Sequence, residues 1–335
     1  MKMEAKSSMG SQSDFPSRIW QLVCYSIIAF SGVFGNSLVI SVLVKTKALR
    51  QSVFGIYIGS LAIADILVTS LCIPVYVMST SSFQDHPSGL GGDILCKLWT
   101  GYFVLFYFAV VSIFTLVAIL YERYLAICHP FKARTRSTKR RAIVTICLIW
   151  VLSFAPNYAL FGGLQSTDTG KGSLGAHCTT INLEQYYVLW KAFYVFVFLI
   201  QYVAPISCMV YFILRINTAL AEGKLRALTS TTDSGRSALL YTISTRRKSV
   251  RTVLIMIISF FACWSLNQVL YFMLNLERGV PWNGNLTQTS VVLCFLSSSV
   301  NPVIYAFRVK DFRLGFSNIL TCRKTTRVHH FSNSL

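Results

Sequence analysis

Long runs of apolar residues alternate with short polar and basic stretches along most of the chain. Each run is long enough to cross a bilayer as a helix, which takes about 20 mostly apolar residues. The pattern predicts an all-α membrane protein, a bundle of seven transmembrane helices followed by a short amphipathic eighth helix. The expected spans are Ile19–Val44, Val53–Met78, Ile94–Ile119, Ala142–Leu164, Tyr186–Leu214, Val253–Leu276 and Leu286–Phe307.

Three other architectures fit the pattern less well. A transmembrane β-barrel would show alternating stretches of about ten residues, whereas these runs are continuous. A seven-span transporter or channel should show paired broken helices or more charges at mid-bilayer. An intramembrane enzyme would need a buried nucleophile with a base, or a metal cluster. Of five histidines, only His129 and His177 flank a span and none lies inside one, so we expect no catalytic or metal site.

The composition supports lipid as the solvent. Hydrophobic residues make up 54% of the chain and charged residues 13%, about half of the roughly 25% typical of soluble domains. The net charge of +19 would suit a nucleic-acid binder, but the basic residues lie almost entirely between the apolar runs, so we reject nucleic acid as a partner. The polar segment 1–18 predicts no cleavable signal peptide.

The basic residues also predict the orientation. Of 31 Lys and Arg residues, 24 lie on one side of the expected spans, and cytoplasmic connections retain such residues. We therefore expect an extracellular N-terminal segment at 1–18, a seven-span domain at 19–307 with a third cytoplasmic loop at 215–252, and a cytoplasmic amphipathic helix and tail at 308–335. The basic loops would also contact anionic membrane lipid.

Two features on the expected outer side agree with this orientation. Asn285 begins an Asn-Leu-Thr glycosylation acceptor. Among ten cysteines, only Cys96 and Cys178 fall at or beyond outer helix ends, where oxidation is possible. We predict a disulfide between them, with two unpaired thiols as the alternative.

One carboxylate, Asp65, lies deep inside an expected span. An ionisable group there costs at least about 2.5 to 3.5 kcal/mol on insertion scales, so it indicates a functional site. Such a group could bind Na⁺ through oxygen ligands or titrate, and a hydrogen-bonded structural cluster is the alternative. We expect no other cofactor. Polar residues at comparable depth in other spans are Asn36, Ser112, Ser297, Ser298 and Asn301.

Several short motifs follow one another through the spans in a characteristic order. They are Gly35-Asn36, Leu61-Ala62-Ile63-Ala64-Asp65, Glu122-Arg123-Tyr124, Trp150, Pro205, Phe260 with Cys263-Trp264, and Asn301-Pro302-Val303-Ile304-Tyr305. In this order the chain resembles the rhodopsin-like (class A) G-protein-coupled receptors, over nearly its whole length.

The resemblance implies a plasma-membrane receptor that couples an extracellular agonist to a heterotrimeric G protein through an outward swing of the sixth helix. A receptor kinase and arrestin would be further partners. Arg123 would be the switch, held at rest by Glu122. The implied coupling residues are Glu122, Arg123, Tyr124, Asn301, Pro302 and Tyr305, and the implied activation core is Ile113, Pro205, Phe260 and Trp264.

Four departures from the family pattern predict raised basal activity. The sixth span has Leu266 where proline is usual, and Ile213 replaces a tyrosine that normally pairs with Tyr305. The base of the sixth helix carries Arg246 and Arg247 instead of an acidic residue, and Cys96 lies two residues farther from Arg123 than usual.

The matched motifs also limit the agonist. Phe103 or Leu105 stands where amine receptors place an aspartate, and Phe295 stands where opsins carry the retinal-bearing lysine. Segment 1–18 is too short for a folded ligand-binding domain. The expected outer cavity combines amides and phenols with aromatic walls, which suit a peptide. Its expected lining is Tyr76, Trp99, Tyr102, Phe106, Glu184, Tyr194, Gln201, Asn267, Gln268, Tyr271 and Thr287.

The second and third spans narrow the resemblance further. Their segments 72–76 and 112–116 resemble those of neuropeptide receptors of the galanin, allatostatin and RFamide group. A neuropeptide is the agonist this favours, and a lipid or other non-amine small molecule is the alternative.

On the cytoplasmic side, Ser244, Thr245 and Ser249 stand beside basic residues, where phosphate would offset positive charge. A solvated linker is the alternative. After Tyr305, apolar and basic residues interleave as in a helix lying on a membrane. Cys322 at its end is a candidate for palmitoylation.

Overall fold

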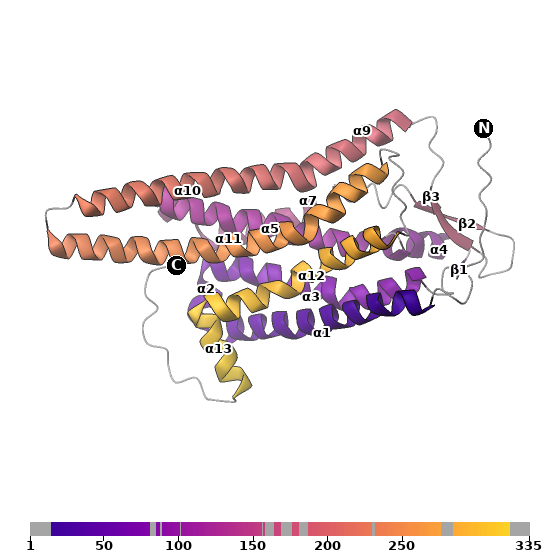
Figure 1. Cartoon of the computed structure of the whole chain (residues 1–335), viewed down its shortest axis with the longest axis horizontal. Helices are drawn as coiled ribbons and strands as arrows, with labels where there is room; N and C mark the ends of the chain where they lie inside the picture. The colour runs from indigo at the N-terminus through magenta and orange to yellow at the C-terminus, as the bar shows by residue number, and fades with distance from the viewer. Residues whose placement is uncertain are drawn as a thin grey trace.

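The computed structural model describes residues 15–80, 85–87, 89–100, 102–155, 157, 164–168, 176–180, 187–229, 232–275 and 284–321. It is an elongated bundle whose long helices run side by side along one axis (Figure 1). The helices are α1 (Phe15–Lys45), α2 (Lys47–Gln51), α3 (Val53–Thr80), α4 (Leu90–Leu95), α5 (Phe103–Cys128), α6 (Pro130–Arg136), α7 (Lys139–Leu152), α9 (Tyr187–Phe198), α10 (Ala204–Leu228), α11 (Asp233–Asn275), α12 (Asn285–Arg308) and α13 (Lys310–Leu320), with π-helical segments η3 (Cys96–Thr100) and η5 (Leu199–Val203).

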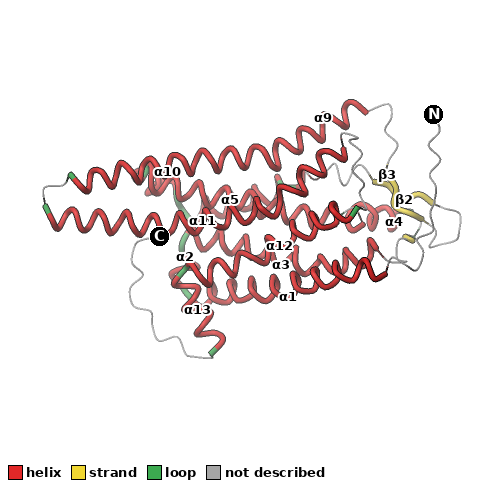
Figure 2. The backbone as a smooth tube through the Cα atoms, viewed as in Figure 1, coloured by secondary structure: helices red, strands yellow, loops and turns green. Residues whose placement is uncertain are grey.

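The bundle has two different ends. Three short strands, β1 (Asp85–His86), β2 (Leu164–Asp168) and β3 (Ala176–Thr180), gather at one end (Figure 2). β3 is central and pairs antiparallel with both neighbours. We call this the disulfide end, because it carries the Cys96–Cys178 bond. The opposite end, where α10 ends at Leu228 and α11 begins at Asp233, is the hairpin end.

Within the described residues, six helical stretches are long and apolar enough to cross a membrane. They correspond to six of the seven expected spans. The fourth expected span is only partly described, since α7 covers Lys139–Leu152 and residues 158–163 lie outside the described part. The expected end of that span is wrong, because Leu164 begins strand β2.

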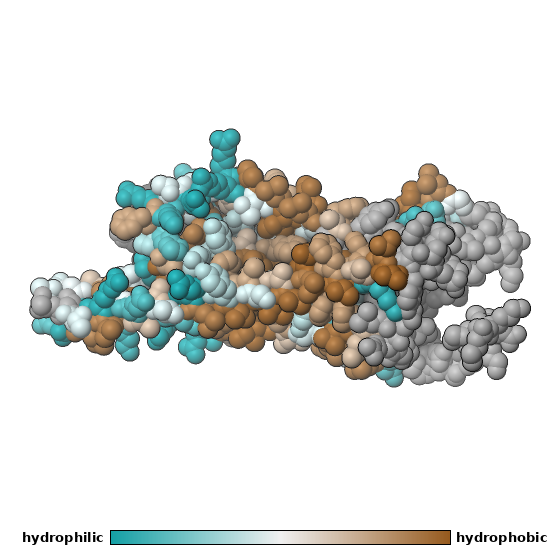
Figure 3. Space-filling model, turned by 90° about the horizontal axis from the view of Figure 1, so that it is seen from above, coloured by the Kyte–Doolittle hydropathy of each residue, from teal (hydrophilic) through white to brown (hydrophobic). Residues whose placement is uncertain are grey.

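The surface over these helices is apolar. On the face seen in Figure 3, hydrophobic residues cover the middle of the molecule, and hydrophilic residues concentrate toward the hairpin end. Phe30, Val151 and Phe196 are 75%, 70% and 55% exposed. Large apolar side chains that point outward from a bundle of this length are those that meet lipid tails.

The third span departs from its expected bounds. The chain approaches it through α4 and η3, and the helix is interrupted at Tyr102, whose φ of 58° is left-handed. The continuous helix α5 then begins at Phe103 and runs beyond Ile119 to Cys128. It ends at His129 because the residue before a proline, here Pro130, is disfavoured in helical geometry.

The segment 215–252, expected to be a loop, is mostly helical. α10 continues to Leu228, and α11 begins at Asp233 and runs for 43 residues. Both helices project past the rest of the bundle (Figure 1). Leu220, Ala227 and Ile243 are buried in this hairpin, so the otherwise polar sequence still has an apolar contact face that stabilises helix.

The helix expected after the last span is present as α13. Phe312 and Phe316 are buried, and the Phe312 ring stacks on that of Tyr305 with 5.2 Å between centroids. α13 also approaches α1 closely, since a Cβ atom on Gly315 would lie 2.6 Å from Val42. Glycine at this position lets the two backbones pack together.

Candidate functional site

Asp65 lies in the centre of the bundle and joins three helices. Its side chain on α3 is buried. Ser112 Oγ of α5 donates a hydrogen bond of 3.0 Å to one carboxylate oxygen, and Asn301 Nδ2 of α12 donates one of 2.8 Å to the other. The expected grouping of these three residues is therefore present.

Asn36 has a different partner from the one expected. Its Nδ2 donates to the carbonyl oxygens of Gly32 and Ser298, each at 3.0 Å. The second carbonyl needs a donor because Pro302, four residues later in α12, has no N–H to give it. Asn36 thus replaces a missing helix bond instead of contacting Asp65, and its buried Oδ1 has no partner within the described residues.

An aromatic cluster lies between this polar centre and the disulfide end. The Trp264 side chain of α11 is fully buried, and its indole nitrogen donates to Ser297 Oγ of α12 at 3.3 Å. Its ring stacks on Phe260 at 5.1 Å, and Phe106 of α5 meets it edge-on at 6.3 Å. Ser297, expected beside Asp65, therefore belongs to the aromatic cluster.

The other two residues of the implied activation core are buried. Ile113 of α5 faces the interior of the bundle, and Pro205 is the second residue of α10, which follows the π-helical segment η5. Because Pro205 cannot donate the backbone bond of a continuous α-helix, a wide turn at this point is physically reasonable.

Most residues of the expected outer cavity lie toward the disulfide end. Tyr194 of α9 meets Tyr271 of α11 edge-on at 6.0 Å. Asn267 Nδ2 of α11 donates to Ser290 Oγ of α12 at 3.2 Å, which ties these helices together. Gln201, Gln268 and Thr287 are buried close to the same helix ends.

The remaining residues of the expected outer cavity lie in different parts of the bundle. Phe106 belongs to the aromatic cluster. Trp99 is half-buried in η3, and its buried indole N–H has no acceptor among the described residues. Tyr102 stands at the helix interruption. The side chain of Tyr76 and all of Glu184 lie outside the described part.

The predicted disulfide is formed. Cys96, the first residue of η3, bonds to Cys178 in β3, with their Cα atoms 5.3 Å apart. It anchors the strands of the disulfide end to the segment that leads into α5. Asn285, the glycosylation candidate, is the exposed first residue of α12, and Cys322 lies outside the described residues.

Glu122 and Arg123 are both described, and no direct ion pair within 4 Å joins them, although the charge of Glu122 still acts on the Arg123 guanidinium. Adjacent helix residues do not face each other, and these two point to different neighbours. Ser137 Oγ donates to Glu122 Oε2 at 2.5 Å, whereas the guanidinium carbon of Arg123 lies 4.4 Å from the centroid of the Phe54 ring.

The surroundings of Arg123 explain its position. The side chain is only 7% exposed, and its Nε has no hydrogen-bond partner within the described part of the chain. A buried guanidinium over an aromatic face is stabilised by a cation–π interaction. The sequence gives no sign of the contact with Phe54, the second residue of α3, which lies far away in the chain.

Tyr124 and Tyr305 are the remaining two residues of the implied coupling set. The Tyr124 hydroxyl hydrogen-bonds His129 Nε2 at 2.9 Å, and its ring stacks on Phe212 of α10 at 5.1 Å. Tyr305 is buried against Phe312, and its hydroxyl is without a partner among the described residues. A buried hydroxyl without a hydrogen bond costs free energy in this conformation, and the same hydroxyl is free to form a hydrogen bond in another conformation.

Within the described residues, no cluster of three or more His, Cys, Asp and Glu could hold a metal ion. The carboxylate of Asp65 and the hydroxyl of Ser112 are oxygen donors, the type that a hard cation prefers.

Comparison with known proteins identifies the class. Residues 35–305 match the family described as "7 transmembrane receptor (rhodopsin family)". The chain belongs to this family of G-protein-coupled receptors, which are multi-pass membrane proteins that signal and are not enzymes.

Its similar relatives are receptors named for peptides. The chain is 28% identical to galanin receptor type 1 of Rattus norvegicus over 92% of this chain and 84% of that protein. It is 28% identical to cholecystokinin receptor type A of Cavia porcellus over 92% and 83%, respectively. Neuromedin-U receptor 2 of Mus musculus is 30% identical over 89% of this chain and 74% of that protein.

Proposed function

We propose that the chain is a receptor for an extracellular neuropeptide and that it activates a heterotrimeric G protein. The observation that carries the ligand class is the neutral, amide-rich set of buried side chains toward the disulfide end, including Gln201, Asn267 and Gln268. Amides both donate and accept hydrogen bonds, as a peptide backbone does. The names of the relatives support the same class.

The third helix argues against a cationic amine. Phe103 and Leu105, the candidates for the counter-ion position, are an aromatic and an aliphatic residue that are both buried. An ammonium group would lose its hydration there without gaining a charged partner. The indole N–H of Trp99 instead offers one hydrogen bond to a ligand carbonyl.

In this proposal the disulfide end is extracellular and the hairpin end cytoplasmic. The basic residues of the α10–α11 hairpin, of α6 and of the first turn of α7 support this orientation. Agonist contact would reach Trp264, whose bond to Ser297 links α11 to α12. Rearrangement there would release Arg123 from the Phe54 ring and expose it to the G protein.

Further parts of the proposal concern ions and modification. Asp65, Ser112, Ser298 and Asn301 surround the position proposed for Na⁺, with Asp65 and Ser112 as oxygen ligands. Asn285 would carry glycan and Cys322 palmitate. A receptor kinase would modify residues of α11 before arrestin binds, and those candidates are Ser244, Thr245 and Ser249.

The test is a screen of the receptor at the cell surface with peptide, lipid and amine libraries, read by a panel of G-protein dissociation sensors. We expect at least one peptide to activate it. Arg123→Ala at matched surface expression should abolish the response without removing peptide binding. Activation by amines or lipids with no response to any peptide would contradict the proposed ligand class.

A further inference from the structure

Two hydroxyl groups form a short hydrogen-bonded chain between η5 and α11 that the function described above does not use. The Tyr202 hydroxyl, in the π-helical segment η5, donates to Ser265 Oγ of α11 at 2.7 Å. The Ser265 hydroxyl in turn donates to the backbone carbonyl of Phe261, one turn earlier in α11, at 2.6 Å. Because Ser265 Oγ accepts from Tyr202, its own proton is left to point at the Phe261 carbonyl.

This chain of hydroxyls reaches α11 beside its buried tryptophan. Ser265 directly follows Trp264 of the aromatic cluster. It directly precedes Leu266, which stands where the family usually has proline. A proline there would remove the helix bond from residue 266 to the carbonyl of Ala262 and would bend the helix. α11 is a continuous helix through this point and lacks that source of a bend.

Ser265 weakens the helix at the same place by other means. In an α-helix the Phe261 carbonyl accepts from the backbone N–H of Ser265, four residues later, so here it receives two donors. A serine that bonds the carbonyl four residues earlier competes with the backbone bond, slightly destabilises the helix and often bends it. The side chain thus supplies, next to Trp264, a weak point of the kind that proline supplies.

Aromatic packing fixes the Tyr202 hydroxyl over Ser265. The Tyr202 ring meets that of Phe261 edge-on, with 6.2 Å between centroids. One turn earlier, the Phe198 ring stacks on that of Phe272 of α11 at 4.4 Å. Phe261, Ser265 and Phe272 share one face of α11 by their helical spacing, so the rings on both sides of the hydroxyl pair hold the two helices in register.

We propose that Ser265 takes the place of the missing proline as the flexible point of α11, and that Tyr202 is a positioning residue that keeps the Ser265 hydroxyl on the Phe261 carbonyl. Gln201, beside Tyr202, and Gln268, about one turn after Ser265, are buried amides of the proposed peptide site. A peptide that moves Gln201 would move Tyr202 with it and change the flexibility of α11. This consequence for signalling rests on the function proposed above, whereas the local flexibility does not.

The experiment is amide hydrogen exchange of the purified full-length receptor in detergent, read by mass spectrometry over residues 259–268. Exchange reports how often the backbone bonds open. Ser265→Ala removes the competing donor, so this segment should exchange about two- to tenfold more slowly than in the wild type, the factor that one hydrogen bond contributes. Tyr202→Phe should slow exchange in the same way and should have no further effect once residue 265 is alanine.

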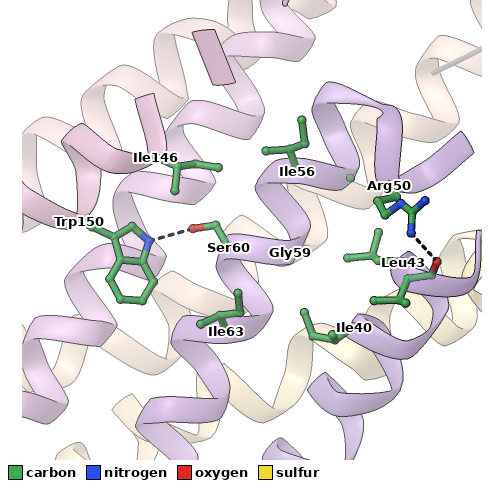
Figure 4. A pocket seen from close by; sticks show the side chains of 11 residues that line it. Ile40, Leu43, Arg50, Ile56, Gly59, Ser60, Ile63, Ile146 and Trp150 are labelled. Atoms are coloured by element: carbon green, nitrogen blue, oxygen red, sulfur yellow. Dashed lines mark hydrogen bonds between the residues drawn. The ribbon is translucent and has the colours of Figure 1, made fainter. Parts of the chain in front are cut away.

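Two control substitutions separate the hydroxyl pair from other effects. Ser265→Thr keeps a donor that can reach the same carbonyl, as Thr69 Oγ1 does with the Asp65 carbonyl at 2.7 Å, and should exchange as the wild type does. Ser60→Ala removes a different hydroxyl that joins two helices. Ser60 Oγ accepts from the Trp150 indole at 3.0 Å in the wall of a groove between α1, α3 and α7 (Figure 4), so its loss should leave exchange in α11 unchanged.

Agonist-free signalling at matched surface expression is the second measurement. Ser265→Ala and Tyr202→Phe should each lower G-protein dissociation about two- to tenfold. Adding Leu266→Pro to Ser265→Ala should restore it, because proline returns a bend to α11. A role of Ser265 in packing alone would not be rescued by proline at the next position.

Four results would overturn the proposal. They are unchanged exchange in Ser265→Ala, slower exchange when Tyr202→Phe is added to Ser265→Ala, equal slowing by Ser60→Ala, and low signalling in a folded Ser265→Ala, Leu266→Pro double variant. Should that double variant fail to fold, the comparison of Ser265→Thr with Ser265→Ala decides. Failure of the proposed function would differ, since no G protein would respond to any variant or to the wild type while the exchange pattern would remain.

Discussion

Replacing Asn36 by alanine tests whether its amide stands in for the helix bond that Pro302 cannot make. The change leaves the Ser298 carbonyl buried without a donor, since Asn36 Nδ2 is its 3.0 Å partner. An unsatisfied buried acceptor costs about 1–3 kcal/mol. At roughly 2 °C per kcal/mol for a chain of this size, the unfolding midpoint should fall by about 2–6 °C.

The decisive measurement is a double-mutant cycle. Pro302→Ala supplies a backbone N–H four residues after Ser298, so the carbonyl regains a partner within α12. Asn36→Ala should then cost less in the Pro302→Ala background than in the wild type, with a coupling energy of about 1–2 kcal/mol. The readout is the intrinsic fluorescence of the purified receptor on heating, because Trp264 is fully buried.

A neighbouring substitution controls for general effects on α1. Ser37→Ala changes an exposed residue of the same helix and should move the midpoint little. If Asn36→Ala costs the same with proline as with alanine at position 302, Asn36 does not replace the missing bond, and the reasoning is refuted.

Three further predictions concern the two ends of the bundle. Phe54→Leu removes the ring under Arg123 and should raise agonist-free signalling about two- to tenfold, which corresponds to roughly 0.4–1.4 kcal/mol. Phe54→Tyr keeps a ring and should not raise it. Equal signalling by Phe54→Leu and the wild type at matched surface expression would exclude the ring as a restraint. Ser137→Ala deprives Glu122 of its donor and should lower the unfolding midpoint by about 2 °C, while Ser137→Thr keeps the hydroxyl and the midpoint. Cys178→Ser should lower surface expression by removing a cross-link commonly worth about 2–4 kcal/mol, and reduction of the wild type should release two thiols in intact-mass labelling; no such release would contradict the bond.

The sequence predicts the transmembrane helices well because apolar runs of that length have few other structures available in lipid. It does not predict the helical hairpin of α10 and α11. The contacts that stabilise the hairpin come from a few buried residues, Leu220, Ala227 and Ile243, dispersed among polar ones. A sparse pattern of this kind is hard to distinguish from a solvated linker.

The sequence likewise predicts some contacts of the candidate site and not others. Depth within a span correctly groups Asp65 with Ser112 and Asn301, since buried polar groups must find one another. Depth alone does not reveal that Asn36 serves a backbone carbonyl. Proximity in the sequence points to Glu122 as the neighbour of Arg123 and does not reveal that the guanidinium lies over the Phe54 ring.

The length of α11 gives it mechanical leverage. Its 43 residues span roughly 65 Å, about twice the thickness of a bilayer's hydrocarbon core. From Trp264 to the helix start at Asp233 is about 46 Å at 1.5 Å per residue, so tilting the rod by about 10° around that tryptophan would carry its far tip through about 8 Å. A small change in packing around Trp264 would thus produce a large displacement at the far tip of α11, where a partner protein would bind.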